Sequence, residues 1–135
     1  MHWYLDVLEK YAVFTGRSRR AEYWYFQLFN FLIGFALVFT FSFLGGVVTA
    51  MAGADSRAAA TAADGVYILY ALATFLPALG VLVRRLHDTG RSGWWVLIGF
   101  LPFVGGIVLL VFCIQDGEPG PNQYGSNPKA GAGSF

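Results

Sequence analysis

Three long stretches without a charged residue constrain most strongly what this chain can fold into. No Lys, Arg, Asp or Glu occurs in residues 23–54, 65–83 or 92–115, which are 32, 19 and 24 residues long. A helix needs about 20 apolar residues to cross the roughly 30 Å hydrocarbon core of a bilayer. Only 13% of the residues are charged, which is about half the share found in soluble domains. A soluble globular protein is therefore excluded.

The charge-free stretches predict an all-α membrane protein with three transmembrane helices, at about 24–48, 66–83 and 94–114. These helices belong to a single integral-membrane domain that covers residues 1–129. The polar tail at 116–135 is rich in Gly, Pro, Asn and Ser, which are typical turn residues.

The third predicted helix contains residues that bend helices. Pro102 is followed by Gly105 and Gly106, so a kink is expected where neighbouring groups satisfy the freed carbonyls. In a re-entrant alternative, the chain folds back at this point and returns to the side from which it came. Because the 24 charge-free residues are too few for two full crossings, we expect three spans.

An interfacial amphipathic helix is predicted at about 3–14, before the first transmembrane helix. Its apolar side carries Trp3, Tyr4, Val7, Leu8, Tyr11 and Phe14, and its polar side carries His2, Asp6, Glu9 and Lys10. A helix with this pattern lies in the plane of the membrane interface.

The distribution of Lys and Arg predicts the orientation. The region before the first span holds four of these residues and the loop between the second and third spans holds three, whereas the first loop and the tail hold one each. Because basic loops stay inside the cell, we expect a cytoplasmic N-terminus. Three spans then place the tail on the opposite side of the membrane.

Two arginine-rich segments share the predicted cytoplasmic side and form one candidate binding surface for an anionic headgroup. Its arginines are Arg17, Arg19, Arg20, Arg84, Arg85 and Arg91, and Glu22, His87 and Asp88 are supporting residues. Guanidinium groups bind phosphate oxygens well, and each cation near an anionic leaflet contributes about 1 kcal/mol. Two other interpretations of residues 84–91 remain open, namely a tight turn whose charges fix topology and a proton relay through His87 and Asp88.

Enzyme chemistry is not expected. Cys113 is the single cysteine, which excludes an intrachain disulfide and a multi-cysteine zinc site, and it lies in an apolar stretch where a thiol is inert. We find no convincing metal site, no activated nucleophile, no phosphate-binding loop and no sign of a cofactor. A net charge of +1 argues against a nucleic-acid-binding module.

Residues 14–24 and 84–95 together resemble the bacterial inner-membrane family known as domain of unknown function 805. The first segment reads FTGRSRRAEYW and the second RRLHDTGRSGWW, and residues 115–128 are similar to the end of that family. The resemblance covers roughly residues 3–129. It implies a small multi-pass protein of the bacterial inner membrane, and it supplies no established catalytic or binding residues.

The sequence therefore predicts a non-enzymatic binding or assembly component. It would recognise anionic lipid headgroups or a phosphate-bearing ligand at the cytoplasmic face. The alternative is an oligomeric transporter or channel subunit, because three short spans enclose little volume alone. Expected partners are membrane lipids, with a homo-oligomer or a larger membrane complex as a further expectation. A packed apolar interior favours lipid binding, whereas a polar water-filled path favours transport.

Overall fold

The computed structural model describes residues 2–130, and its regular structure there is helical. The elements in chain order are α1 (His2–Glu9), α2 (Arg20–Ala52), α3 (Ser56–Asp88), η1 (Gly93–Phe100) and α4 (Val104–Ile114). The predicted all-α class is confirmed for these residues. The chain divides into two compact units, Leu28–Phe75 and the combination of Met1–Gln27 with Leu76–Phe135. Met1 and the last five tail residues, 131–135, lie outside the described residues.

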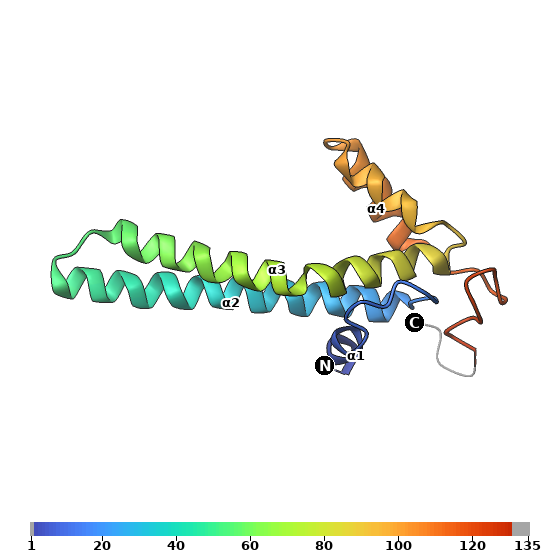
Figure 1. The fold of residues 1–135 in the computed structure, drawn as a ribbon, viewed down its shortest axis with the longest axis horizontal. Helices are drawn as coiled ribbons and strands as arrows, with labels where there is room; N and C mark the ends of the chain where they lie inside the picture. The colour runs from blue at the N-terminus through green and yellow to red at the C-terminus, as the bar shows by residue number, and fades with distance from the viewer. Residues whose placement is uncertain (1, 131–135) are drawn as a thin grey trace. The chain divides into compact units, whose positions relative to one another are not determined.

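The Leu28–Phe75 unit is an antiparallel pair of helical segments from α2 and α3 (Figure 1). Close approach depends on small residues, because a Cβ added to Gly45 would lie 2.5 Å from Cβ of Ala59. Farther along the pair, the Tyr70 hydroxyl donates a hydrogen bond of 2.7 Å to Oδ1 of Asn30. Small residues and interhelical hydrogen bonds are the usual means of joining helices in a membrane.

Helices α2 and α3 are both long and apolar enough to cross a membrane. Each has 33 residues, or about 50 Å at 1.5 Å per residue, so each exceeds the hydrocarbon thickness. The predicted spans at 24–48 and 66–83 lie inside them. Much of the surface of α2 is apolar and open, including a stack of four Phe rings whose members are 59% to 69% exposed, Phe31, Phe35, Phe39 and Phe43.

The N-terminal helix α1 ends at Glu9, so it is shorter than the helix predicted at 3–14. Part of its apolar side packs inside the protein. Tyr4 and Val7 are buried, and the Tyr4 ring stacks on Phe26 at the start of α2, with 5.3 Å between ring centroids. Protein therefore covers part of the apolar side of α1. The interfacial position of this helix stays a prediction.

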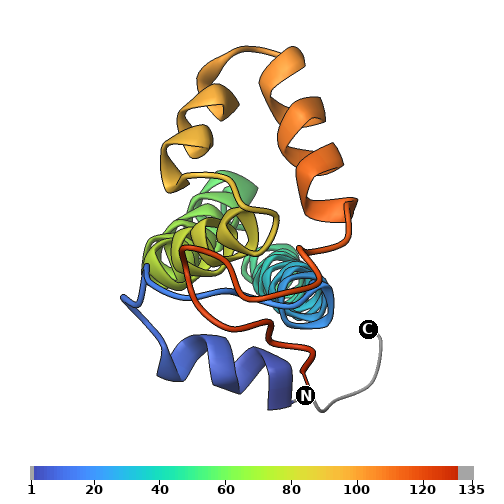
Figure 2. The ribbon, with the colours of Figure 1, turned by 90° about the vertical axis from the view of Figure 1, so that its right-hand side faces the viewer.

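The prediction of a single transmembrane helix at 94–114, kinked near Pro102, is wrong. The 3₁₀ helix η1 and the α-helix α4 form a hairpin instead, and Figure 2 shows the two arms side by side. The break follows from Pro102, whose ring lacks an N–H donor and disfavours a helical conformation at the preceding residue. By contrast, Pro77 lies inside α3 without ending it.

Glycine allows the two arms of this hairpin to pack closely. A Cβ on Gly105 would lie 1.7 Å from the carbonyl oxygen of Ile98, so the backbones meet directly at this point. Toward the base of the hairpin, the rings of Trp95 and Phe112 form an edge-to-face pair with centroids 5.5 Å apart. The hairpin is thus closed by contacts along its length.

Candidate functional site: a buried arginine node

The segment before α2 lies against the C-terminal end of α3. The Ser18 N–H donates to the carbonyl oxygen of Arg84 at 3.0 Å, and the Ser18 carbonyl accepts from Nη1 of Arg85 at 3.2 Å. The predicted proximity of the two arginine-rich segments is confirmed by these contacts. We call the buried charged group formed here, Arg17, Glu22, Arg84, Arg85 and Asp88, the arginine node.

Asp88 is the centre of the arginine node. Its Oδ1 accepts from Nε of Arg17 at 3.0 Å and lies 2.9 Å from Nη2 of the same side chain. Its Oδ2 forms an ion pair with Nη1 of Arg85. All three side chains are at most 1% exposed. Two guanidinium groups therefore neutralise one carboxylate in a desolvated position, which leaves a buried excess of positive charge.

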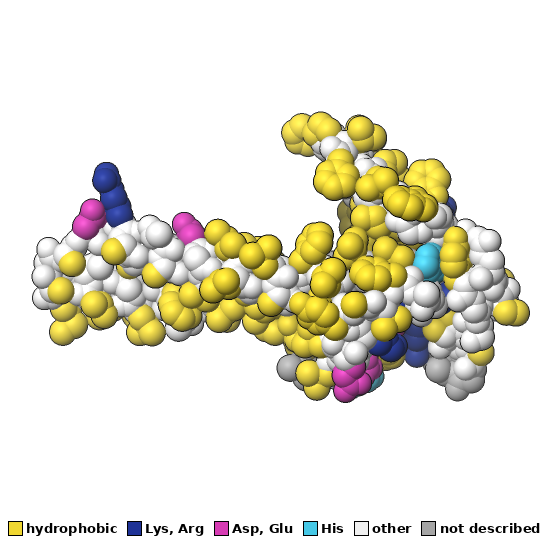
Figure 3. Space-filling view, in the orientation of Figure 1, with side chains coloured by type: hydrophobic (Ala, Val, Ile, Leu, Met, Phe, Trp, Pro, Cys, Tyr) yellow, Lys and Arg dark blue, Asp and Glu magenta, His cyan; other side chains and the backbone are white. Residues whose placement is uncertain are grey.

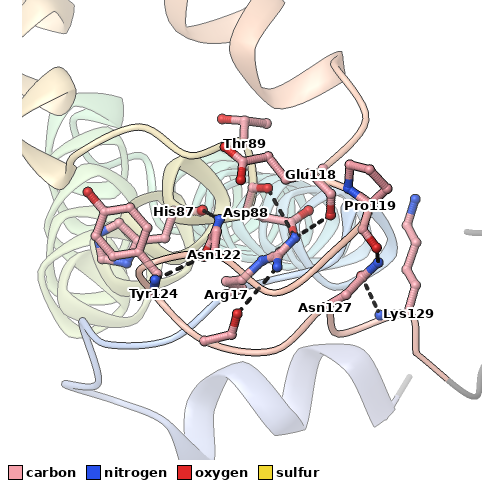
Figure 4. Close-up of polar contacts among 12 residues, drawn as sticks. Arg17, His87, Asp88, Thr89, Glu118, Pro119, Asn122, Tyr124, Asn127 and Lys129 are labelled. Atoms are coloured by element: carbon pink, nitrogen blue, oxygen red, sulfur yellow. Dashed lines mark hydrogen bonds and ion pairs between the residues drawn. The ribbon is translucent and has the colours of Figure 1, made fainter.

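The remaining Arg17 donors hold the C-terminal tail (Figure 4). Nη2 donates to the carbonyl oxygen of Glu118 at 2.7 Å, and Nη1 donates to that of Gly120 at 2.7 Å. The Glu118 N–H in turn donates to the carbonyl oxygen of Asp88 at 2.8 Å. Backbone carbonyls thus supply the acceptors that a second carboxylate would otherwise provide.

Arg85 joins the node to the end of α4. Its Nε donates to the carbonyl oxygen of Cys113 at 3.2 Å, and its Nη2 donates to that of Gln115. Trp24 also donates to the Cys113 carbonyl, at 3.3 Å from its Nε1. The last carbonyls of a helix have no partner within the helix, so side-chain donors stabilise this end of α4.

Arg84 pairs with Glu22, which lies in the first turn of α2. Nη1 of Arg84 lies 2.7 Å from Oε1 of Glu22, and Nε donates to the carbonyl oxygen of Gly80 at 3.3 Å. Lys10 approaches the same carboxylate at 3.7 Å from the more exposed side. Nη2 of Arg84 is buried and has no hydrogen-bond partner among residues 2–130.

His87 is packed between the N-terminal segment and the tail. Its Nδ1 lies 3.0 Å from the carbonyl oxygen of Gly16, so Nδ1 carries the proton and donates. Its ring stacks on Tyr124 with 3.9 Å between centroids, and its carbonyl accepts from Nδ2 of Asn122 at 2.9 Å. Burial lowers the pKa of His87, and the hydrogen bond to Gly16 partly opposes that shift.

Two glycines permit the tail to lie this close to the end of α3. A Cβ on Gly117 would lie 2.1 Å from Oδ2 of Asp88, and a Cβ on Gly90 would lie 1.7 Å from Oε1 of Glu118. Gly90 also has a positive φ of 76°, which side chains rarely adopt. Glycine at 117 therefore lets the tail lie against the Asp88 carboxylate, and the backbone conformation at residue 90 favours glycine.

The expectation that the tail lies across the membrane from Arg17 is wrong. The hydrogen bond of 2.7 Å between Arg17 and Glu118 cannot extend over a hydrocarbon core of about 30 Å. Both ends of the η1–α4 hairpin, Ser92 and Gln115, therefore belong to the same side. The physical reason is the turn at Pro102, which reverses the chain halfway through the third charge-free stretch.

The six predicted headgroup-binding arginines divide into two groups. Arg17, Arg84 and Arg85 are buried in the node and hydrogen-bonded to protein. The other three, Arg19, Arg20 and Arg91, are half-buried. The Arg91 guanidinium lies 3.9 Å from the centroid of the Phe112 ring, the Arg19 guanidinium lies 5.4 Å from that of Trp3, and Nε of Arg20 lies 3.8 Å from Oδ1 of Asp116.

Sequence reasoning missed the tail residues that complete the node. They contribute mainly through backbone groups, at Glu118 and Gly120, or through Asn122 and the Tyr124 ring. A carbonyl acceptor has no residue signature, so charge patterns could not identify it. The available signal was the tail's composition of Gly, Pro and Asn, which is typical of turns or of partly disordered chain.

The arginine node acts by electrostatic attraction, because its ion pairs and hydrogen bonds connect neighbouring segments of the chain. Both of its carboxylates are paired with arginine, and no group of three or more His, Cys, Asp or Glu suited to a metal occurs within residues 2–130. The node joins the segment before α2, the end of α3, the end of α4 and the tail.

Two long apolar helices whose ends meet in a buried arginine node define an all-helical membrane protein. The chain belongs to the family described as "Protein of unknown function (DUF805)", whose model matches residues 11–126. "Inner membrane protein YhaI" of Escherichia coli (strain K12) is 45% identical over 132 residues, which cover 98% of this chain and 99% of the relative. "Inner membrane protein YhaH" of the same strain is 41% identical over 130 residues, covering 96% and 98%.

No solved structure matches the chain. The relatives and the two apolar helices support the bacterial inner membrane as its location. The resemblance inferred from residues 14–24 and 84–95 is confirmed by the family match.

Proposed function

We propose that this chain is a non-enzymatic, multi-pass inner-membrane protein that binds anionic lipid headgroups at its cytoplasmic face. Helices α2 and α3 span the bilayer, and α1 lies at the interface. The N-terminus and residues 84–91 are cytoplasmic, because these regions hold seven of the nine basic residues. The tail, which contacts Arg17, lies on the same side.

The division between buried and half-buried arginines carries this proposal. Guanidinium groups that are saturated by internal partners, such as that of Arg17, have no donors left for a ligand. Arg19, Arg20 and Arg91 keep part of their surface open, and Arg19 and Arg91 lie over aromatic rings. Arginine beside aromatic side chains suits the headgroup level of a membrane, where a charged group meets phosphate and a ring meets the acyl boundary.

Native mass spectrometry of the purified chain tests the proposal directly. The delipidated protein is mixed with phosphatidylglycerol, with phosphatidylcholine or with inorganic phosphate, and bound species are counted. We expect retention of phosphatidylglycerol over phosphatidylcholine. The triple variant Arg19→Gln, Arg20→Gln, Arg91→Gln should lose retention by about 100-fold, since each cation contributes about 1 kcal/mol.

Two matched variants separate specific binding from charge and topology. Arg57→Gln, at the start of α3, removes the single basic residue between Arg20 and Arg84 and should leave lipid retention unchanged. The triple change of the same three arginines to Lys keeps charge and insertion, but it removes the planar fork that matches phosphate oxygens and should weaken retention. Equal retention in all four proteins contradicts headgroup recognition, and retention of inorganic phosphate alone would indicate a soluble phosphate-bearing ligand.

The alternative function, an oligomeric transporter or channel subunit, remains a prediction from the sequence. Ion and proton paths in membranes usually need ionisable side chains inside the spans. The charge-free residues 23–54 and 65–83 make up most of α2 and α3. No contact among residues 2–130 favours transport over headgroup binding.

A further inference from the structure

The η1–α4 hairpin has arms of a length that fits one leaflet rather than a whole bilayer. The 3₁₀ arm has 8 residues and the α-helical arm has 11. At about 2.0 Å and 1.5 Å per residue, both arms are about 16 Å long. The hydrocarbon core is about 30 Å thick, so a hairpin that enters from one face reaches the region of the midplane.

The surface of the hairpin is apolar. No charged residue occurs at 92–115, and Figure 3 shows hydrophobic side chains covering the hairpin. Its large exposed apolar residues are Trp94, Trp95, Leu97, Phe100, Leu101, Phe103, Val104, Ile107, Leu110, Val111 and Ile114. Such an area in water would promote aggregation, so it needs an apolar covering.

The base of the hairpin is polar and fixed to the protein. Arg85 donates to the carbonyl oxygens of Cys113 and Gln115, which lie at the C-terminal end of α4. At the start of η1, the Ser92 hydroxyl accepts from the Trp94 N–H at 3.3 Å. Beside it, the Arg91 guanidinium lies over Phe112. Charge is thus confined to the base, and the hairpin becomes purely apolar away from it.

The tip of the hairpin combines a strained backbone with an open aromatic ring. Phe103 has φ 63° and ψ −56°, and the Val104 N–H donates to the Pro102 carbonyl oxygen at 2.7 Å. This is the rare γ-turn with positive φ, a strained conformation for a residue with a side chain. The Phe103 ring is nevertheless 89% exposed, so no packing within the protein compensates for that strain.

From these observations we infer that the η1–α4 hairpin is a re-entrant element inserted into the hydrocarbon of a single leaflet. Its partner is the acyl chains of the leaflet next to the arginine node, and the Phe103 ring lies near the bilayer midplane. Contact with acyl chains covers the open apolar surface, including the ring that the strained turn presents. The inference does not depend on headgroup binding, because it concerns the hairpin and not the charge of Arg19 or Arg20.

Spin-label depth measurements in vesicles of phosphatidylglycerol and phosphatidylcholine test the inference. Nitroxide labels are attached to full-length variants Phe103→Cys, Phe39→Cys and Ser126→Cys. Phe39 is 59% exposed on α2 and is the hydrocarbon control, and Ser126 in the polar tail is the aqueous control. The natural chain is the blank, because Cys113 is 1% exposed and should not react.

Frequent collisions of the nitroxide with oxygen indicate that the label lies in hydrocarbon. Frequent collisions with a charged nickel chelate indicate that it lies in water. We expect the label at 103 to match that at 39, with chelate collisions about tenfold fewer than at 126, because charged solutes avoid hydrocarbon. Phe100→Cys, at a site 83% exposed, provides a second tip label if Phe103→Cys does not fold. Repeating the set with Cys113→Ala checks the blank.

Three results would overturn the inference. Frequent chelate collisions at both tip sites would place the hairpin outside the lipid. Reaction of the tip cysteine with an impermeant thiol reagent added outside the cell would show a full crossing. Dipolar broadening at the tip that disappears on dilution with unlabelled protein would show that a second copy, rather than lipid, covers the hairpin.

Discussion

Arg17 and Asp88 are 71 residues apart in the chain, yet their side chains form an ion pair of 2.9 Å in which both partners are 1% exposed. Asp88 also binds Arg85, and Arg17 also binds tail carbonyls. This pair therefore connects the N-terminal segment, α3 and the tail. We therefore expect the positions of the hairpin and of Arg19, Arg20 and Arg91 to depend on it.

Removing the Asp88 carboxylate should destabilise the protein strongly. Asp88→Asn leaves Arg17 and Arg85 buried without a counter-charge, so we expect the free energy of unfolding to fall by about 3–5 kcal/mol. Thermal unfolding in detergent, followed by circular dichroism, measures the loss. Asp64→Asn is the matched control, because Asp64 is exposed on α3, and it should change stability little. Similar stability for both variants would contradict the central role of Asp88.

The Arg84–Glu22 pair should behave differently when both partners are replaced. Glu22→Leu alone should cost about 3 kcal/mol, because it leaves Arg84 buried without a counter-charge. Arg84→Met should cost less, because Lys10 still lies 3.7 Å from the Glu22 carboxylate. The double variant should cost clearly less than the sum, since two apolar residues can fill the same space. A double-mutant cycle measured by chemical unfolding gives the coupling energy, and strictly additive losses would show that the two residues do not interact.

Two adjacent glycines of α4 should respond in opposite ways to the same substitution. Gly105→Ala places a Cβ 1.7 Å from the Ile98 carbonyl oxygen, so the arms must separate at a cost of about 1–3 kcal/mol. Gly106→Ala meets nothing within 4 Å and should stabilise the helix by up to about 1 kcal/mol.

Tryptophan emission reports on the packing of the hairpin in these two variants, because Trp95 packs against Phe112. The melting temperature should fall with Gly105→Ala and rise slightly with Gly106→Ala, and emission should change only with Gly105→Ala. If Gly105→Ala is neutral, the close contact of the two arms is wrong.

Much of the helical architecture could be predicted from charge spacing alone. Apolar stretches without charge must avoid water, so 24–48 and 66–83 identify α2 and α3. The helices extend beyond those limits to Arg20 and Asp88, because backbone hydrogen bonding continues through polar residues such as Arg84 and Arg85. The charge pattern marks the apolar part of a helix and not its ends.

The division of labour among the arginines could not be predicted. A count of basic residues treats Arg17 and Arg19 alike, although Arg17 is buried by a tail more than 100 residues away in the sequence. By contrast, a signal was present in the sequence at Pro102, where Gly105 and Gly106 follow the proline and suggested the re-entrant alternative. Pro77 lies inside α3 without ending it, whereas the chain reverses at Pro102.

Acidification should weaken the packing of the tail through His87. Burial lowers the pKa of this ring below its ordinary value of 6.5, so the unfolded chain binds more protons than the folded chain between the two pKa values. The contribution of His87 to the free energy of unfolding is therefore fully present above pH 6.5. It falls as the pH decreases toward the pKa of the folded state.

Melting temperatures measured from pH 7.5 to about 5.5 test this pH dependence. We expect a steady decrease for the natural chain and a smaller one for His87→Gln, which cannot take up a proton. A melting temperature that rises on acidification, or an equal decrease in both proteins, would show that His87 is not responsible.

The most direct test is to determine whether the tail lies on the cytoplasmic side of the membrane, together with Arg17. Ser126→Cys and Arg57→Cys are treated with an impermeant thiol reagent in intact spheroplasts and in inverted membrane vesicles. We expect residue 126 to react only in inverted vesicles and residue 57 only in spheroplasts, because the tail is bound to Arg17 on the cytoplasmic side. Reaction of residue 126 in spheroplasts, with residue 57 also reacting there, would contradict this expectation.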